Sequence, residues 1–137
     1  MSLSKAQYEA KRWLRTAEED LKAARTLNDA EMYSHACFLA QQCGEKAMKA
    51  LWLFFDEDPW GHSVQKLVMQ YPRNESINNL ETWLSNAAFL DKFYIPTRYP
   101  NGLPDLTPGQ SYEASDTKKA LEKAEFFVKQ VNTILGE

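Results

Sequence analysis

Two tyrosines and an arginine lie among three prolines in the segment YIPTRYPNGLPD, residues 94 to 105. The planar guanidinium of arginine suits a phosphate group, and tyrosine rings can stack on nucleic-acid bases. Proline fixes the backbone, which lowers the entropy lost when such a segment meets a ligand. We therefore predict that Arg98, Tyr94 and Tyr99 bind a phosphate-bearing ligand. The alternative is that the segment only covers one end of the fold with its aromatic rings.

Further polar residues could complete such a site. Lys46, Lys49 and Gln42 lie on one expected helix and could add charge and hydrogen bonds to a ligand. His62, after Trp-Gly, is also a candidate ligand-binding residue, because histidine can exchange protons near neutral pH. His35 has the same chemistry, but a lone histidine beside aromatic residues more often packs or caps a helix. Neither histidine has an evident serine, cysteine or carboxylate partner in the sequence.

The sequence lacks the motifs of several other kinds of binding and catalytic site. The sequence has no glycine-rich phosphate loop, no HExxH and no GxSxG. Cys37 and Cys43 are six residues apart in one expected helix, too far along its axis for a disulfide, and are interpreted as small buried hydrophobic residues. No ExxH pair suggests a di-metal bundle, and the carboxylates are expected to be solvated. We predict no metal, no cofactor and no assigned catalytic residue.

The elements that would position these residues are helices. Apolar residues recur at intervals of three and four, and no segment alternates with a period of two. Helices are expected at residues 5–27, 30–55, 63–71 and 77–93, and from residue 115 or 116 to the C-terminus. Asn28 or Asp29, Ser63, and Ser115 or Asp116 are their expected N-caps. The chain is thus predicted to be one all-α domain, residues 1–137: an antiparallel bundle of four long helices and one short helix.

The second expected helix is apolar on two faces. Small residues dominate one face. Its residues follow one another at intervals of four and three: Ala36, Ala40, Cys43, Ala47, Ala50 and Phe54. The opposite face consists of Phe38, Gln42, Glu45, Lys49 and Trp52, and two of these residues, Phe38 and Trp52, are aromatic. A helix with two such faces is central in a bundle, or its second face forms part of a dimer interface or a ligand cleft.

Composition limits the partners. The chain has 137 residues and a formal net charge of −3, which argues against broad nonspecific DNA binding without excluding a local basic pocket. No apolar run approaches the ~20 residues that span a bilayer, and no export signal is apparent at the N-terminus. We expect no membrane association and a cytoplasmic location.

Four segments resemble a known family, the HEPN domain (higher eukaryotes and prokaryotes nucleotide-binding domain). They are AEEDLKAA, YSHACFLAQQCGEKAMKALW, GHSVQKL and LDKFYIPTRYP, which occur in the family's order between about residues 15 and 135. The resemblance implies an up-and-down helical bundle that forms a homodimer. It also implies pairing with a minimal nucleotidyltransferase in a toxin–antitoxin-like module, and nucleotide or RNA as a ligand.

The sequence departs from the ribonuclease branch of that family. Those members carry a histidine four to six residues after an arginine, and a dimer brings two such motifs together for metal-independent cleavage. Here Arg98 is followed by no histidine, and none occurs after His62. Arginine alone cannot exchange a proton at neutral pH. We therefore favour a noncatalytic binding protein; the alternatives are an atypical ribonuclease that uses His35 or His62, and a purely structural dimer with Arg98 in its interface.

Overall fold

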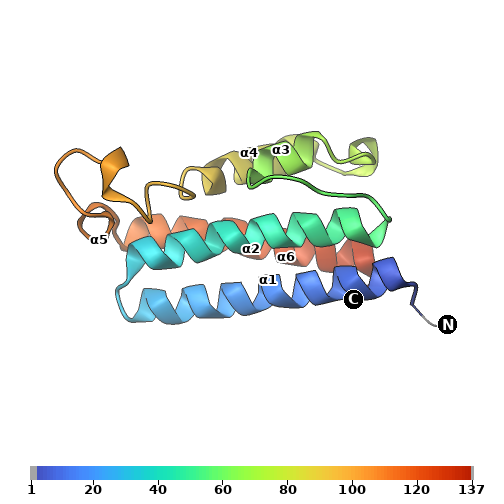
Figure 1. The fold of residues 1–137 in the computed structure, drawn as a ribbon, viewed down its shortest axis with the longest axis horizontal. Coiled ribbons are helices and arrows are strands. Elements are labelled where there is room, and N and C mark those ends of the chain that lie inside the picture. The colour runs from blue at the N-terminus through green and yellow to red at the C-terminus, as the bar shows by residue number, and fades with distance from the viewer. Residues whose placement is uncertain (1–2, 137) are drawn as a thin grey trace.

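The computed structural model describes residues 3–136, and these residues form helices and no strand (Figure 1). The α-helices are α1 (Lys5–Asp29), α2 (Tyr33–Phe54), α3 (Val64–Met69), α4 (Leu80–Asp91), α5 (Pro108–Ser111) and α6 (Ala114–Leu135). Two 3₁₀ turns lie at Asn74–Ser76 and Pro100–Gly102. The long helices α1, α2, α4 and α6 run alternately up and down (Figure 1). The predicted all-α bundle of four long helices is confirmed, and a very short helix, α5, is added to it.

Helix α1 begins where its sequence provides a capping box. The Ser4 hydroxyl accepts from the Gln7 amide, and the Gln7 side chain accepts from the Ser4 amide. The expected apolar stripe is buried: Leu14, Ala17, Leu21 and Ala24. The expected cap of the next helix was wrong, because α1 continues to Asp29 and α2 starts only at Tyr33, after Met32.

Helix α2 lies at the centre of the bundle, between α1 and the α3–α4 pair (Figure 1). It also packs on α6, and thirteen of its residues are buried. Gly44 allows the closest approach: a Cβ at this position would lie 2.7 Å from Leu90 Cδ1 on α4. The interpretation of this helix as a central bundle helix is confirmed.

The remaining helix ends differ from expectation by a few residues. Ser63 caps α3 as predicted, and its hydroxyl accepts from the Lys66 amide. Helix α4 starts at Leu80, three residues later than expected. Helix α6 is capped by Glu113, whose backbone amide donates to Asp116, so neither Ser115 nor Asp116 is the cap residue.

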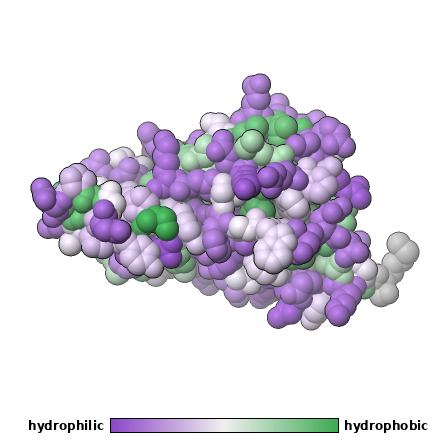
Figure 2. All heavy atoms as spheres, turned by 45° about the horizontal axis from the view of Figure 1, so that its top comes forward, coloured by the Kyte–Doolittle hydropathy of each residue, from purple (hydrophilic) through white to green (hydrophobic). Residues whose placement is uncertain are grey.

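Both cysteines are free and buried, as predicted from their spacing. The Cys37 sulfur lies 3.6 Å from the Thr117 hydroxyl, and Cys43 faces the Ala124 carbonyl. The face of the molecule drawn in Figure 2 is mostly hydrophilic, with small, separate apolar areas. None of the helices found between residues 3 and 136 has both the length and the apolar character needed to cross a membrane.

Candidate functional site

The proline-rich segment folds as a series of hydrogen-bonded turns after α4. The Thr97 hydroxyl donates to the Phe93 carbonyl, and the Arg98 amide donates to the Ile95 carbonyl over 3.0 Å. The Arg98 side chain turns back on the same segment, where its Nε donates to the Tyr94 carbonyl over 2.7 Å. The bond from Nε fixes the orientation of the guanidinium and leaves its two terminal nitrogens available for hydrogen bonds to a ligand.

Three aromatic rings surround the Arg98 guanidinium. Its central carbon lies 4.7 Å from the ring centre of Phe38, 4.4 Å from that of Tyr94 and 5.2 Å from that of Tyr99. Contacts of this kind are attractive and hold the planar group in place. Arg98 remains exposed, and no carboxylate within residues 3–136 forms a salt bridge with it. The guanidinium is therefore positioned without being neutralised.

A hollow of about 280 Å³ adjoins the guanidinium. It is lined by residues from α2, the proline-rich segment and α5: Ser34, His35, Phe38, Thr97, Arg98, Pro108 and Gly109. His35 is exposed, and its Nδ1 lies 3.5 Å from the Ser34 hydroxyl. The fold thus brings an arginine and a histidine, 63 positions apart in the sequence, to one hollow.

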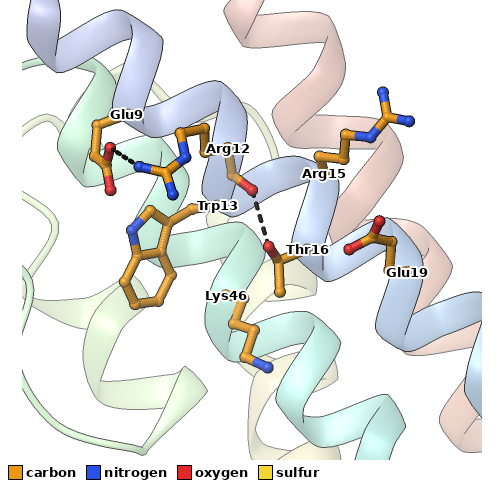
Figure 3. A pocket seen from close by; sticks show the side chains of 7 residues that line it. All are labelled: Glu9, Arg12, Trp13, Arg15, Thr16, Glu19 and Lys46. Atoms are coloured by element: carbon orange, nitrogen blue, oxygen red, sulfur yellow. Dashed lines mark hydrogen bonds and ion pairs between the residues drawn. The ribbon is translucent and has the colours of Figure 1, made fainter.

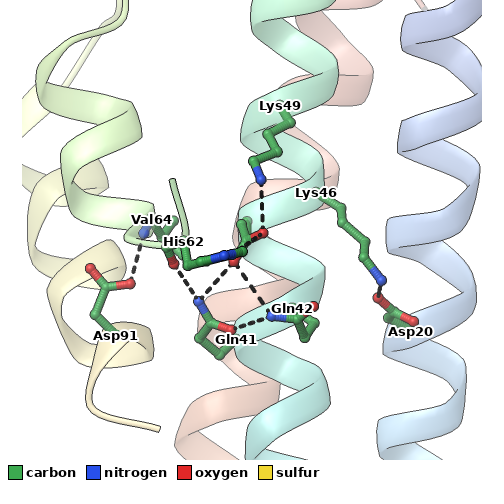
Figure 4. A network of polar contacts seen from close by, with 9 residues as sticks. Asp20, Gln41, Gln42, Lys46, Lys49, His62, Val64 and Asp91 are labelled. Carbon is green, nitrogen blue, oxygen red and sulfur yellow. Dashed lines mark hydrogen bonds and ion pairs between the residues drawn. The ribbon is translucent and has the colours of Figure 1, made fainter. Parts of the chain in front are cut away.

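Asp91, at the end of α4, connects the proline-rich segment that follows α4 to α3. Its carboxylate accepts from the Ser63 hydroxyl over 2.7 Å and from the amides of Val64, at 2.7 Å, and Gln65, at 3.0 Å. Figure 4 shows the bond to Val64. A carboxylate at a helix N-terminus satisfies free N–H groups and interacts favourably with the helix dipole. Asp91 therefore fixes the start of α3 against the end of α4.

This connection brings His62 onto Tyr94. His62 immediately precedes Ser63, and Tyr94 lies three residues after Asp91. The two rings are stacked, with their centres 5.0 Å apart and their planes at 16°. The same tyrosine ring therefore contacts both Arg98 and His62.

A buried carboxylate, Glu45, organises the polar residues beside this stack; Figure 4 labels its neighbours Gln41, Gln42, Lys49 and His62. Its side chain is 5% exposed and lies 3.0 Å from Lys49 Nζ and 3.4 Å from His62 Nδ1. The Gln41 amide donates to the His62 carbonyl over 2.9 Å, and the Gln42 amide donates to Gln41 Oε1 over 2.8 Å. Because a buried charge without partners is costly, this network both satisfies Glu45 and holds His62 in place.

Lys46 points in a different direction. Its ammonium pairs with Asp20 of α1 at 2.7 Å (Figure 4). Lys46 also borders a second hollow of about 370 Å³ on α1 (Figure 3). Of the predicted ligand-binding residues, Arg98, Tyr94, Tyr99 and His62 thus lie together, and Gln42 and Lys49 adjoin them through Glu45.

Sequence reasoning missed several residues of this region. Phe38 was identified only as an unexpected aromatic residue on α2, yet it contacts the Arg98 guanidinium. Asp91 gave no signal, because its partners lie 26 to 28 residues earlier in the chain. Trp13 borders the hollow on α1 and was not considered. A three- or four-residue spacing from Lys49 could have identified Glu45 as its partner.

The described residues include neither a metal-binding cluster nor an activated thiol. Between residues 3 and 136, no group of three His, Cys, Asp or Glu side chains is arranged to hold a metal ion. Burial raises the pKa of the Cys37 thiol to about 11 and that of Cys43 still further. Neither thiol is therefore an activated nucleophile at neutral pH.

Comparison with known proteins identifies the family. A model of the HEPN domain family matches residues 10–134. The chain belongs to the HEPN domain family. TT1696 from Thermus thermophilus, for which a crystal structure is known, has 33% sequence identity to this chain. The two structures match with a TM-score of 0.85, over 90% of this chain and 96% of TT1696. The crystal structure of ST0689, an archaeal HEPN homologue, is 32% identical, with a TM-score of 0.77, over 98% of this chain and 99% of that one.

A curated relative of this HEPN protein is named as a candidate toxin. The candidate toxin MJ1304 of Methanocaldococcus jannaschii is 25% identical over 138 residues, covering 93% of this chain and 89% of the relative. The resemblance seen in the sequence is therefore confirmed at the level of the family and the fold.

Proposed function

We propose that this HEPN-domain protein is a noncatalytic binding protein that holds a phosphate of a nucleotide or nucleic acid at Arg98. The observation that supports this proposal is the exposed guanidinium held among Phe38, Tyr94 and Tyr99 beside a hollow. Its terminal N–H groups can form a two-pronged, charge-assisted contact with phosphate oxygens. The adjacent aromatic rings offer surfaces on which a base could stack.

The exposure of Arg98 weighs against one structural role, in which its guanidinium would be buried against a carboxylate of another helix of the same chain. Such a role would need that partner, because burial of an unpaired charge is costly. Burial of Arg98 in a dimer interface is the remaining structural alternative. Arg98 is exposed, and within residues 3–136 it forms no salt bridge. An exposed, positioned and unneutralised arginine is the arrangement that an anionic ligand requires.

Titration calorimetry with ATP, GTP and a short RNA tests the proposal. We expect Arg98→Ala to weaken binding by about 10- to 100-fold, because hydrogen bonds to charged groups contribute about 1.5–3 kcal/mol. Arg73→Ala is the matched control, since the Arg73 guanidinium also lies over an aromatic ring, 4.4 Å from the centre of Phe55, but outside the site. Equal affinities of wild type and Arg98→Ala for all three ligands would refute the proposal.

We further propose that the protein forms a homodimer and pairs with a minimal nucleotidyltransferase in a toxin–antitoxin-like module. Three exposed apolar side chains on the proline-rich segment and its extension support a protein contact there: Ile95, Tyr99 and Leu106. The name of the relative MJ1304 supports the toxin context. Analytical ultracentrifugation measures the dimer, and co-purification with a nucleotidyltransferase encoded by a neighbouring gene tests the pairing. A protein that stays monomeric at all concentrations would contradict the homodimer. Separate elution of the two proteins would contradict the pairing with a nucleotidyltransferase.

A second candidate function is an atypical metal-independent ribonuclease. The observation that favours it is the shared hollow of His35 and Arg98, because a histidine near an arginine can exchange protons while the arginine holds the phosphate. This reading predicts RNA cleavage that His35→Ala abolishes and toxicity on expression. His62→Ala tests the other histidine, which stacks on Tyr94. RNA that stays intact at high protein concentration would exclude the ribonuclease and leave the binding proposal in place.

A further inference from the structure

A second group of aromatic and cationic side chains lies on the other side of the buried ion pair between Glu45 and Lys49. The Lys49 ammonium lies 5.8 Å from the ring centre of Trp13, on α1. The partner carboxylate of Lys49 lies 3.4 Å from His62 Nδ1. Trp13 and His62 therefore flank one ion pair, the first from α1 and the second from the loop before α3.

Both rings can be reached by a ligand. The His62 side chain is 61% exposed although its ring is stacked on Tyr94, so a large part of the ring remains free. Trp13 is half-buried and borders the hollow of about 370 Å³ on α1 (Figure 3). Lys46, Arg12 and Arg15 border the same hollow. Aromatic rings interleaved with cations along a surface are typical of proteins that bind single-stranded nucleic acids.

The charges in this region are mostly neutralised. Lys49 pairs with Glu45, Lys46 with Asp20 and Arg12 with Glu9. These pairs remove the repulsion that the carboxylates would exert on a phosphate backbone. Of the three cations around the hollow on α1, only Arg15 forms no salt bridge within the described part of the chain, and Glu19 lies at the same hollow. Stacking is therefore the main interaction that this surface offers, with few phosphate contacts.

We propose that His62 and Trp13 bind bases of one single-stranded nucleic acid whose phosphate is held by Arg98. The inference rests on the proposed function of Arg98 and names the ligand class: an extended strand, not a mononucleotide. Phe38, which contacts Arg98, and Lys49, which contacts Trp13, are eleven residues apart on α2. That separation is about 16 Å along the helix axis, which is longer than a single nucleotide can span.

Binding of a uridine dinucleotide and a uridine octanucleotide, measured by fluorescence anisotropy, tests the inference. Trp13→Leu is expected to weaken binding of the octanucleotide by about 5- to 100-fold, because stacking contributes about 1–3 kcal/mol per base. It is expected to leave the dinucleotide unaffected, since a dinucleotide held at Arg98 is too short to reach Trp13. Trp60→Leu is the matched control, because Trp60 is 79% exposed and lies in the loop before α3.

Arg15→Glu provides a test that does not depend on a partly buried side chain. Arg15 is exposed, so the substitution should leave the fold intact, and it should weaken only the octanucleotide. Lys66→Glu, an exposed position on α3, is the control for the same change of charge. If Arg98→Ala weakens both ligands while Trp13→Leu and Arg15→Glu behave like their controls, the extended surface is refuted and the Arg98 site stands. If Arg98→Ala changes neither affinity, the proposed function itself fails.

Discussion

Replacement of Asp91 by alanine tests how the fold positions the site. The Asp91 carboxylate accepts three hydrogen bonds from the start of α3, and Arg98, Tyr94 and Tyr99 follow it in the chain. A hydrogen bond to a charged group contributes about 1.5–3 kcal/mol, and removal of a capping group costs about 1 kcal/mol. The three bonds share one acceptor and are not additive. Water can also reach the freed donors, because Asp91 and Gln65 are only half-buried. We therefore expect Asp91→Ala to lower the free energy of unfolding by about 2–4 kcal/mol.

Urea unfolding followed by circular dichroism measures this loss. Glu122→Ala is the matched control, because Glu122 is exposed and forms no salt bridge within residues 3–136; its effect should stay within about 0.5 kcal/mol. Ser63→Ala and the double variant complete a thermodynamic cycle. Because Ser63 donates directly to Asp91, we expect a coupling of about 0.5–3 kcal/mol.

The same variant should also weaken ligand binding, although Asp91 lies outside the proposed contact surface. Without the carboxylate, these bonds no longer fix the start of α3 against the end of α4, and the stack of His62 on Tyr94 loosens. A loss of stability for Asp91→Ala no larger than that of Glu122→Ala would refute this reasoning. So would a coupling to Ser63 near zero, because it would mean that the observed bonds do not act together.

Two further predictions concern the core. Gly44→Ala gains about 1 kcal/mol of helix propensity but places a Cβ 2.7 Å from Leu90 Cδ1. Because overpacking costs about 1–3 kcal/mol and Leu90 is fully buried, we expect the free energy of unfolding in urea to fall by up to about 2 kcal/mol. A rise in the free energy of unfolding would contradict the close approach of α2 and α4. Burial raises the pKa of Cys37 from 9.0 to about 11, so its contribution to stability is complete below pH 9 and is lost as the pH rises toward 11. The loss should amount to about 2–3 kcal/mol for this thiol and should be smaller in Cys37→Ala; an equal alkaline loss in both proteins would exclude the thiol as its cause.

The helices could be predicted from the sequence because they depend on local spacing. Leu14, Ala17, Leu21 and Ala24 follow one stripe, and all four are buried. The N-cap residues were predicted less accurately where several neighbouring residues could act as the cap. Asn28 and Asp29 have suitable side chains, but α1 continues through them, and the chain turns at Glu31 with a φ of 60°.

The site could be predicted only in part, because its contacts cross between helices. The turns of the proline-rich segment are local, so Arg98 lies beside Tyr94 and Tyr99, and their role in binding a ligand stays a prediction. The orientation of Lys46 toward Asp20 depends on how α2 is rotated against α1, which no spacing within α2 determines. The capping of α3 by Asp91 likewise requires α3 and α4 to be in place.

The core and the candidate site are connected through α4. Because Gly44 has no side chain, Leu90 packs closely on α2, and we expect this contact to help to position the end of α4. Asp91, the next residue, then fixes the start of α3 and so places His62 against Tyr94. Tyr94 in turn supports the Arg98 guanidinium, so the exposed group proposed to hold phosphate depends on a glycine in the buried centre. A substitution at Gly44 should therefore change ligand affinity as well as stability, whereas an equally destabilising substitution between α1 and α6 should change stability alone.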